Sequence, residues 1–365
     1  MATSPDCCTI PLVTRLRRRT QLVLAVLLLT IGMTSTPAAT RARLGGASDR
    51  LDRFRELASS RLALGDLDPD NPAETYRDIY ALLDDEVVES LASGGVFASS
   101  EFLQDRLDAF GDAWGGAHFK LTRLGRLVIG AFRLTDAGSG NSVRVYGPLR
   151  DEAALLAALY RDGRPSVTPL AGSGEPQFLA TWEGPASGRG TRPLRVDLVQ
   201  AHADSVLVTW STATLFPQGL YARAWVVRAS EVRLRYELHY PGWTPGCEGQ
   251  TEQEDVYRLA PGQGTLTRVS RQQHNAWHRE LHVSVTRLFT ALAEGDEPTL
   301  ATVVPDAALR SRLPTLVPEP ACDAADGVRE TVSIAATTAD RRPWTLTFRR
   351  AGARWRLAAA APVLQ

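Results

Sequence analysis

The chain has 365 residues, of which 44% are hydrophobic and 22% are charged. This composition is ordinary for a globular protein and excludes a chain that is disordered over most of its length. The formal net charge is zero, so there is no electrostatic reason to expect nucleic acid as a partner, because phosphate binding needs a basic patch or stripe.

Residues 15–39 have the pattern of a secretory signal peptide. Four arginines precede an apolar run from Leu22 to Ile31, and small and polar residues follow as far as Ala39. The run is about ten residues long, whereas a transmembrane helix needs roughly 20. We therefore predict a signal peptide over 1–39 and export to the periplasm or the outside of the cell. The alternative is an uncleaved anchor in the inner membrane, which would be the only segment to contact a membrane.

Two features of composition suggest the source and compartment of the protein. Lys120 is the only lysine, which indicates the base composition of a high-GC bacterial genome. Cys247 and Cys322 are the only cysteines after the signal pattern, and an oxidising compartment permits a disulfide between them. Two separate thiols remain the alternative.

The N-terminal half is predicted to contain helices followed by strands. Residues 40–70 suggest a tether and a short helix, and residues 71–165 suggest an α+β unit. Apolar stripes at helical spacing run from Tyr76 to Leu91 and from Leu103 to Trp114, and alternating strand patterns follow up to Tyr146. The segment Asp151–Tyr160 is rich in Ala and Leu and predicts another short helix.

Residues 166–270 predict an antiparallel β region, because short runs rich in Val, Leu, Tyr and Trp alternate with turn residues. Its aromatic residues fit either a core or a surface that stacks on a ligand; they are Trp182, Trp210, Trp225, Tyr236, Tyr240 and Trp243. Arg233 and Arg235 alternate on one predicted strand, and Arg354 and Arg356 alternate on another. Both pairs suggest solvated sheet faces, with an anionic partner as the alternative.

Residues 271–365 begin with a predicted helix near Gln272, whose apolar stripe runs from Trp277 to Leu292. They end with a hairpin in which Trp344, Leu346 and Phe348 face Trp355 and Leu357. Over residues 280–360 this order resembles the cystatin-like, nuclear-transport-factor-like cone fold. The resemblance implies a long helix packed on a curved sheet. The whole chain is therefore predicted to be α+β and rich in antiparallel sheet, with a cone-like C-terminal domain.

The cone-fold resemblance also implies a ligand pocket between helix and sheet and, in some members, catalysis by Asp and His. This sequence departs from that pattern, because no His or Tyr follows His282. Asp306 and Glu330 are the acids that could act in catalysis there. The simpler roles are a helix cap for Asp306 and a solvated strand residue for Glu330.

Three histidines, His274, His278 and His282, recur every four residues on the helix predicted to start near Gln272. Side chains four apart share a helix face and can bring two imidazoles to one metal ion, so a zinc site is one hypothesis. In the simpler interpretation the histidines have a structural role and lie along the border of the apolar stripe. No HExxH motif is present, so the metalloprotease arrangement is absent.

The sequence contains no nucleophile elbow, phosphate-binding glycine loop or dinucleotide fingerprint. We therefore favour a protein without catalytic activity or a cofactor, which binds a small molecule or another protein at the bacterial envelope. One alternative is a secreted hydrolase assembled from distant residues, with His118, His202 or His239 as base. The other is a metal-binding envelope protein that uses the three helix histidines.

Overall fold

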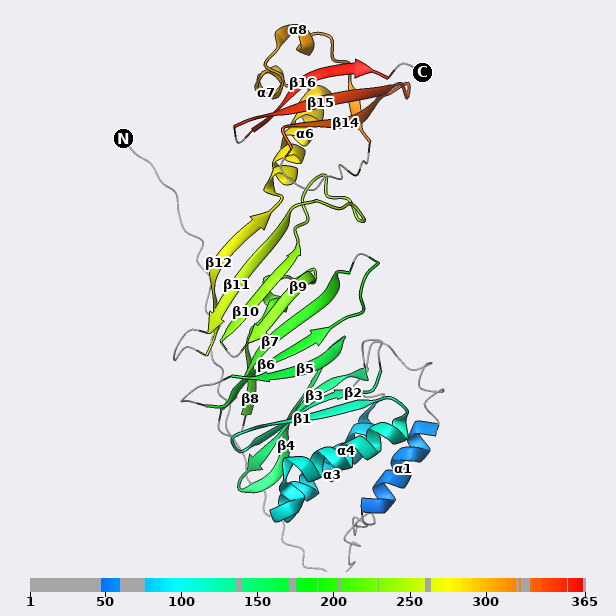
Figure 1. The fold of residues 1–365 in the computed structure, drawn as a ribbon, viewed down its shortest axis with the longest axis vertical. Coiled ribbons are helices and arrows are strands. Elements are labelled where there is room, and N and C mark those ends of the chain that lie inside the picture. The colour runs from blue at the N-terminus through cyan, green and yellow to red at the C-terminus, as the bar shows by residue number, and fades with distance from the viewer. Residues whose placement is uncertain are drawn as a thin grey trace, which may run out of the picture. The chain divides into compact units, whose positions relative to one another are not determined.

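The computed structural model describes residues 47–59, 76–135, 140–170, 175–188, 190–202, 205–228, 230–259, 264–319, 322, 329–352 and 354–363. The predicted signal peptide lies outside these ranges. The fold is α+β with three antiparallel sheets, which confirms the predicted class (Figure 1). Of the helices that the structure describes, none is both long and apolar enough to cross a bilayer.

The first sheet consists of four strands in the order β1-β2-β3-β4 and is covered by helices. The helical elements are α1 (Ala47–Ser59), α3 (Arg77–Ser93), η2 (Gly95–Ala98) and α4 (Ser100–Trp114), and the strands are β1 (His118–Leu124), β2 (Leu127–Arg133), β3 (Ser142–Leu149) and β4 (Glu152–Tyr160). The predicted apolar stripes form its core, where Phe54, Leu83, Leu107 and Phe132 are buried together. Ser99 starts α4 by accepting a hydrogen bond from the Phe102 backbone N–H at 3.2 Å.

The predicted helix at Asp151–Tyr160 is wrong, because this segment is strand β4. Arg150 and Asp151 both have positive φ, 52° and 67°, which are the backbone angles of a two-residue hairpin turn. The turn directs β4 back along β3, where Tyr146 pairs with Leu155 and Leu149 with Glu152. Pairing and packing within the sheet outweigh the helix preference of Ala and Leu, since propensity is a weak prior.

The second sheet has eight strands in the order β12-β11-β10-β9-β7-β6-β5, with β8 paired to β7. The elements are β5 (Arg164–Pro169), β6 (Gln177–Glu183), β7 (Arg192–His202), β8 (Ser205–Ser211), α5 (Thr212–Leu215), β9 (Tyr221–Arg228), β10 (Glu231–Glu237), β11 (Glu252–Leu259) and β12 (Leu266–His274).

Strand β7 has two different partners along the same edge. Its first residues, Arg192 and Pro193, pair with β9, whereas Asp197–His202 pair with β8. Between these stretches the Leu194 N–H donates to the Leu220 carbonyl at 2.8 Å, and the Val196 N–H donates to Thr212 Oγ1 at 2.9 Å. We call this interruption of the ladder the sheet split. Helix α5 and the segment up to Leu220 lie beside it.

Two hydrophobic clusters include alternating residues of β7. Leu194, Val196 and Leu198 belong to a cluster within the eight-stranded sheet. Val199 and Ala201 belong to a cluster that also contains residues of β2 and β3 from the first sheet. Strand β7 is therefore buried on both faces over much of its length.

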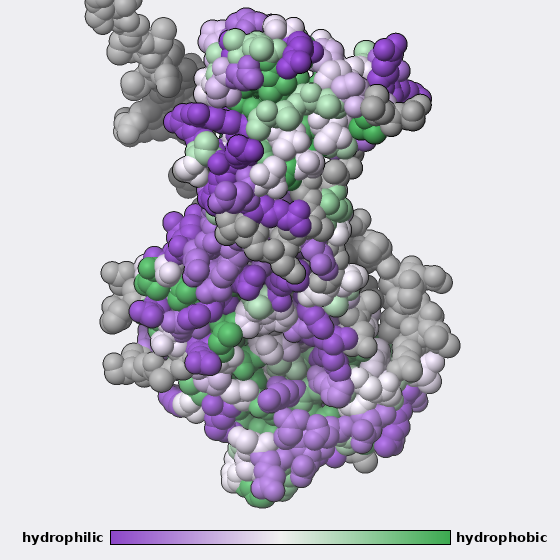
Figure 2. Space-filling model, turned by 45° about the horizontal axis from the view of Figure 1, so that its top comes forward, coloured by the Kyte–Doolittle hydropathy of each residue, from purple (hydrophilic) through white to green (hydrophobic). Residues whose placement is uncertain are grey.

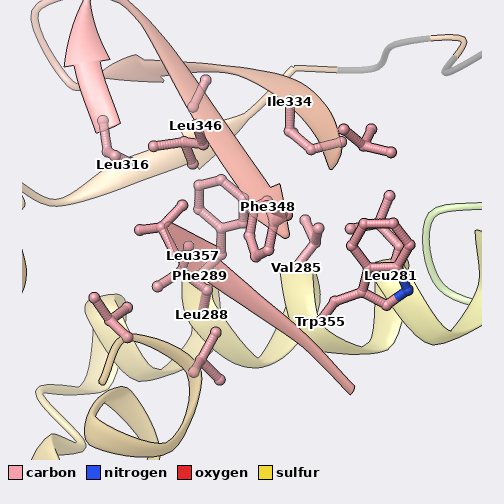
Figure 3. Packing of buried hydrophobic residues seen from close by; sticks show 14 of the residues in the cluster. Leu281, Val285, Leu288, Phe289, Leu316, Ile334, Leu346, Phe348, Trp355 and Leu357 are labelled. Atoms are coloured by element: carbon pink, nitrogen blue, oxygen red, sulfur yellow. The ribbon is translucent and has the colours of Figure 1, made fainter. Parts of the chain in front are cut away.

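The C-terminal part packs one long helix on the third sheet, which has the order β13-β14-β15-β16. Its elements are α6 (Ala276–Glu294), α7 (Glu297–Val303), α8 (Ala307–Arg310), β13 (Leu316–Pro318), β14 (Thr331–Thr338), β15 (Pro343–Ala351) and β16 (Arg354–Pro362). Figure 3 shows Leu281 and Val285 of α6 near Phe348 and Trp355 of the closing hairpin. This arrangement of helix and sheet is the one predicted.

Helix α6 begins later than predicted, because Gln272 belongs to β12. Asn275, with φ 52°, is the single residue between β12 and α6. The predicted domain boundaries at 165/166 and 270/271 fall inside β5 and β12, and the division into domains stays a prediction.

Cys247 and Cys322 lie at disulfide distance, with their Cα atoms 5.0 Å apart, as predicted. The bond joins the segment between β10 and β11 to the segment between β13 and β14. It therefore links the eight-stranded sheet to the C-terminal part.

Candidate ligand-binding site

A cavity of about 460 Å³ lies at the sheet split. It is lined by the end of β4 and the residue after it (Tyr160, Arg161), by Trp182 of β6 and Arg195 of β7, and by Phe216 after α5 and Tyr221 at the start of β9. We call it the split-sheet pocket. Its volume is in the range of small-molecule sites, and a break in the regular ladder is what leaves room for it.

A buried acid lies next to the pocket. Asp197 is fully buried on β7, and its carboxylate accepts hydrogen bonds from Arg195 Nε at 3.0 and 3.1 Å and from the Ser211 hydroxyl. Arg161 Nε is 3.9 Å from the same carboxylate. Because Arg195 and Asp197 are two residues apart on one strand, they lie on the same face, and Asp197 holds Arg195 at the cavity.

Arg161 is incompletely satisfied. Its Nη1 donates to the Tyr160 carbonyl, but its Nε is buried and has no hydrogen-bond partner among the residues that the structure describes. Burial, and after it the positive charge of Arg195, lower the pKa of Arg161. The negative charge of Asp197 acts in the opposite direction on this pKa but does not fully offset the two effects.

Trp182 presents the second unsatisfied donor of the pocket. It lies opposite Arg195 in the β6–β7 register, and only 1% of its surface is exposed. Its indole Nε1 has no hydrogen-bond partner within the described part of the chain. Leaving a buried donor unpaired costs about 1–3 kcal/mol, and the residues that line this cavity carry two such donors.

The remaining wall of the pocket is apolar and aromatic. Phe216 packs edge-on against Tyr236, with ring centroids 4.9 Å apart, and Leu220 is buried in the cluster within the sheet. Tyr221 is 45% exposed although it also lines the cavity. The pocket therefore combines cationic donors with flat apolar surfaces.

The three histidines predicted to share a helix do not do so, and this is a correction. His274 is the last residue of strand β12, while His278 and His282 lie on α6 with their rings stacked 4.5 Å apart. The left-handed conformation of Asn275 ends the strand, so helical spacing does not apply to His274. Tyr240 shares a 2.6 Å hydrogen bond with His278 Nδ1.

Across the described ranges, no group of three or more histidine, cysteine, aspartate or glutamate side chains is arranged to hold a metal ion. Zinc binding itself stays a prediction.

The histidines considered as hydrolytic bases lie elsewhere. His118 is exposed at the start of β1, the exposed His202 is beside Glu175, and His239 stacks on Trp243 with centroids 3.9 Å apart. None of the three is among the residues that line the split-sheet pocket.

The two acids weighed in the C-terminal part have ordinary surroundings. Asp306 accepts from the Ala308 and Leu309 backbone N–H groups at 2.8 and 3.2 Å and so caps α8. Glu330 is exposed just before β14.

The alternating arginines of β10 are paired with glutamates on their own and the neighbouring strand. Arg233 lies within 3.6 Å of Glu231 and Glu254, and Arg235 contacts Glu252. Figure 2 shows a face on which hydrophilic residues predominate. The charges on this solvated face of β10 are therefore balanced. The neighbouring acids offset the positive charge that would attract an anionic partner.

Among the residues that line the pocket, only Trp182 was identified from the sequence as a candidate ligand contact, as one of the aromatic residues of the β region. Arg161 lies within the predicted α+β unit 71–165 and Arg195 within the predicted β region 166–270, and the sequence pattern predicted no site at either residue. The available signal was Arg195 and Asp197 in the strand segment LRVDLVQA, where two charged residues alternate with residues of an otherwise apolar run.

Comparisons of the chain with protein-family models, curated proteins and solved structures found no match.

Proposed function

We propose that this chain is an exported binding protein of the bacterial envelope, which holds a small molecule in the split-sheet pocket without catalysing a reaction on it. The observation that carries the proposal is a pair of buried N–H groups, on Arg161 and Trp182, that have no hydrogen-bond partner within the described residues, both in residues that line one cavity. Neither nitrogen is accessible to solvent, so a bound molecule with acceptor atoms would satisfy them after a local movement of the side chains that line the cavity.

Two observations support export. The N-terminal pattern from Arg15 to Ala39 is typical of a secretory signal peptide. The pairing of Cys247 with Cys322 suits an oxidising compartment, where disulfides persist.

The binding role can be tested by filling the pocket. Ala213 and Thr214 are neighbouring exposed residues of α5, but only Ala213 lines the cavity. We expect Ala213→Trp to weaken binding of a small probe by about tenfold or more, equivalent to about 1.4 kcal/mol, because the indole occupies the cavity. Thr214→Trp is the matched control and should bind as the wild type does.

The measurement is isothermal titration of the full chain with a set of probes that share a naphthalene ring and differ in the group attached at its 2-position. These are 2-naphthoate, 2-naphthamide, 2-naphthyl phosphate and 2-naphthylmethylammonium. Saturable binding of at least one probe, weakened in Ala213→Trp only, supports the proposal. No saturable binding by any probe, or equal binding by Ala213→Trp and the wild type, contradicts it.

A further inference from the structure

We infer that the ligand of the split-sheet pocket is an organic monoanion, a carboxylate carried on a flat apolar body. This inference rests on the proposed function, because it assigns the chemical class of the molecule that the pocket holds.

The charges at the pocket favour a single negative charge on the ligand. Arg161, Arg195 and Asp197 are each at least two-thirds buried and sum to one positive charge. Asp162 also lines the cavity but is exposed, so water and salt screen its charge. A monoanion neutralises the net positive charge of these three side chains, whereas a cation would add to that charge. A dianion would leave excess negative charge beside the Asp197 carboxylate.

The unsatisfied donors favour a carboxylate as the anionic group. A guanidinium presents its N–H groups in a planar fork that matches the two oxygens of a carboxylate. Arg161 Nε and Trp182 Nε1 are both donors without an acceptor in the described residues, and neither can act as an acceptor itself. A carboxylate has enough lone pairs to accept from both, and because neither nitrogen is accessible to solvent, its binding requires the side chains around them to move.

The other walls of the pocket favour a flat apolar body behind the carboxylate. Phe216 and Tyr221 contribute rings, and Leu220 contributes an aliphatic surface. Aromatic side chains stack on flat rings with offset or edge-on geometry. The partial exposure of Tyr221 leaves an apolar ring available at the cavity.

The same four probes test this inference. Charge-assisted hydrogen bonds are roughly twice as strong as neutral ones, so we expect 2-naphthoate to bind at least about tenfold more tightly than 2-naphthamide, and more tightly than the phosphate or the ammonium. Tighter binding of any of the other three probes overturns the inference. If the amide or another probe binds best and Ala213→Trp still weakens its binding, the proposed function stands and only this inference fails.

Two variants test whether Arg161 causes the preference for naphthoate over naphthamide. Arg161→Gln should weaken naphthoate binding much more than naphthamide binding and so remove most of the difference in affinity between the two probes. Arg126→Gln changes an arginine that is 77% exposed, and it should keep the full difference. An undiminished preference in Arg161→Gln overturns the inference. Urea denaturation establishes that each variant is folded.

Trp182→Phe provides a second test that retains an aromatic ring. Its matched control is Trp355→Phe, because Trp355 is equally buried and its indole N–H is also unpartnered among the described residues, but it does not line this cavity. Only the substitution at Trp182 should weaken naphthoate binding. Equal naphthoate affinities in the two variants would count against a ligand hydrogen-bonded to Trp182.

Discussion

Replacing Asp197 with alanine is expected to lower the free energy of unfolding by about 3 kcal/mol. Breaking a buried ion pair typically costs about 3–5 kcal/mol, because it leaves the partner charge uncompensated. We expect the lower end of this range, since Arg195 is 32% exposed and water can solvate part of its charge. The variant also removes the acceptor of the Ser211 hydroxyl, at the point where β8 pairs with β7.

Asp52→Ala is the matched control for Asp197→Ala. Asp52 forms an ion pair with Arg55 on α1, but the side chain of Asp52 is 66% exposed. Exposed pairs of this kind contribute about 0–1 kcal/mol. Urea denaturation of both variants measures the comparison. If Asp197→Ala is no less stable than Asp52→Ala, the buried acid does not hold the sheet split together.

Removing the disulfide between Cys247 and Cys322 is expected to destabilise the folded chain by about 4 kcal/mol. The two cysteines are 75 residues apart, and closing a loop of that length removes a large part of the conformational entropy of the unfolded chain. Urea denaturation with and without a reductant measures the difference.

The double variant Cys247→Ala/Cys322→Ala is the control for this experiment. It should match the reduced wild type, and reductant should not change its stability further. Any further change would come from Cys7 and Cys8, which are also present in the full chain. An unchanged unfolding midpoint for the wild type after full reduction would show that the bond does not contribute to stability.

Much of the fold could be predicted because the apolar patterns are long and regular. The stripes that became α3, α4 and α6 each extend over several turns, and the Trp344–Leu357 alternation identifies its own hairpin. Strand β4 was missed because Arg150 and Asp151 lack the glycine or asparagine that usually marks such a turn. Likewise, nothing in the row of histidines shows that Asn275 ends a strand.

The pocket could not be predicted because it depends on the pairing of strands. Arg161, Trp182 and Tyr221 are far apart in the sequence and come together only where β7 changes its partner from β9 to β8. A pattern along the chain indicates which face of a strand is apolar. It does not indicate where two neighbouring strands share one edge and leave a cavity between them.

The most direct test of a ligand in the split-sheet pocket is the indole N–H signal of Trp182. In the ¹⁵N-labelled full chain, Trp182→Phe identifies this signal as the one that disappears. On addition of saturating 2-naphthoate, our account predicts that the Trp182 signal moves downfield, because an N–H without a hydrogen-bond partner among the described residues gains a carboxylate acceptor. An unmoved Trp182 signal under the same conditions would contradict the account.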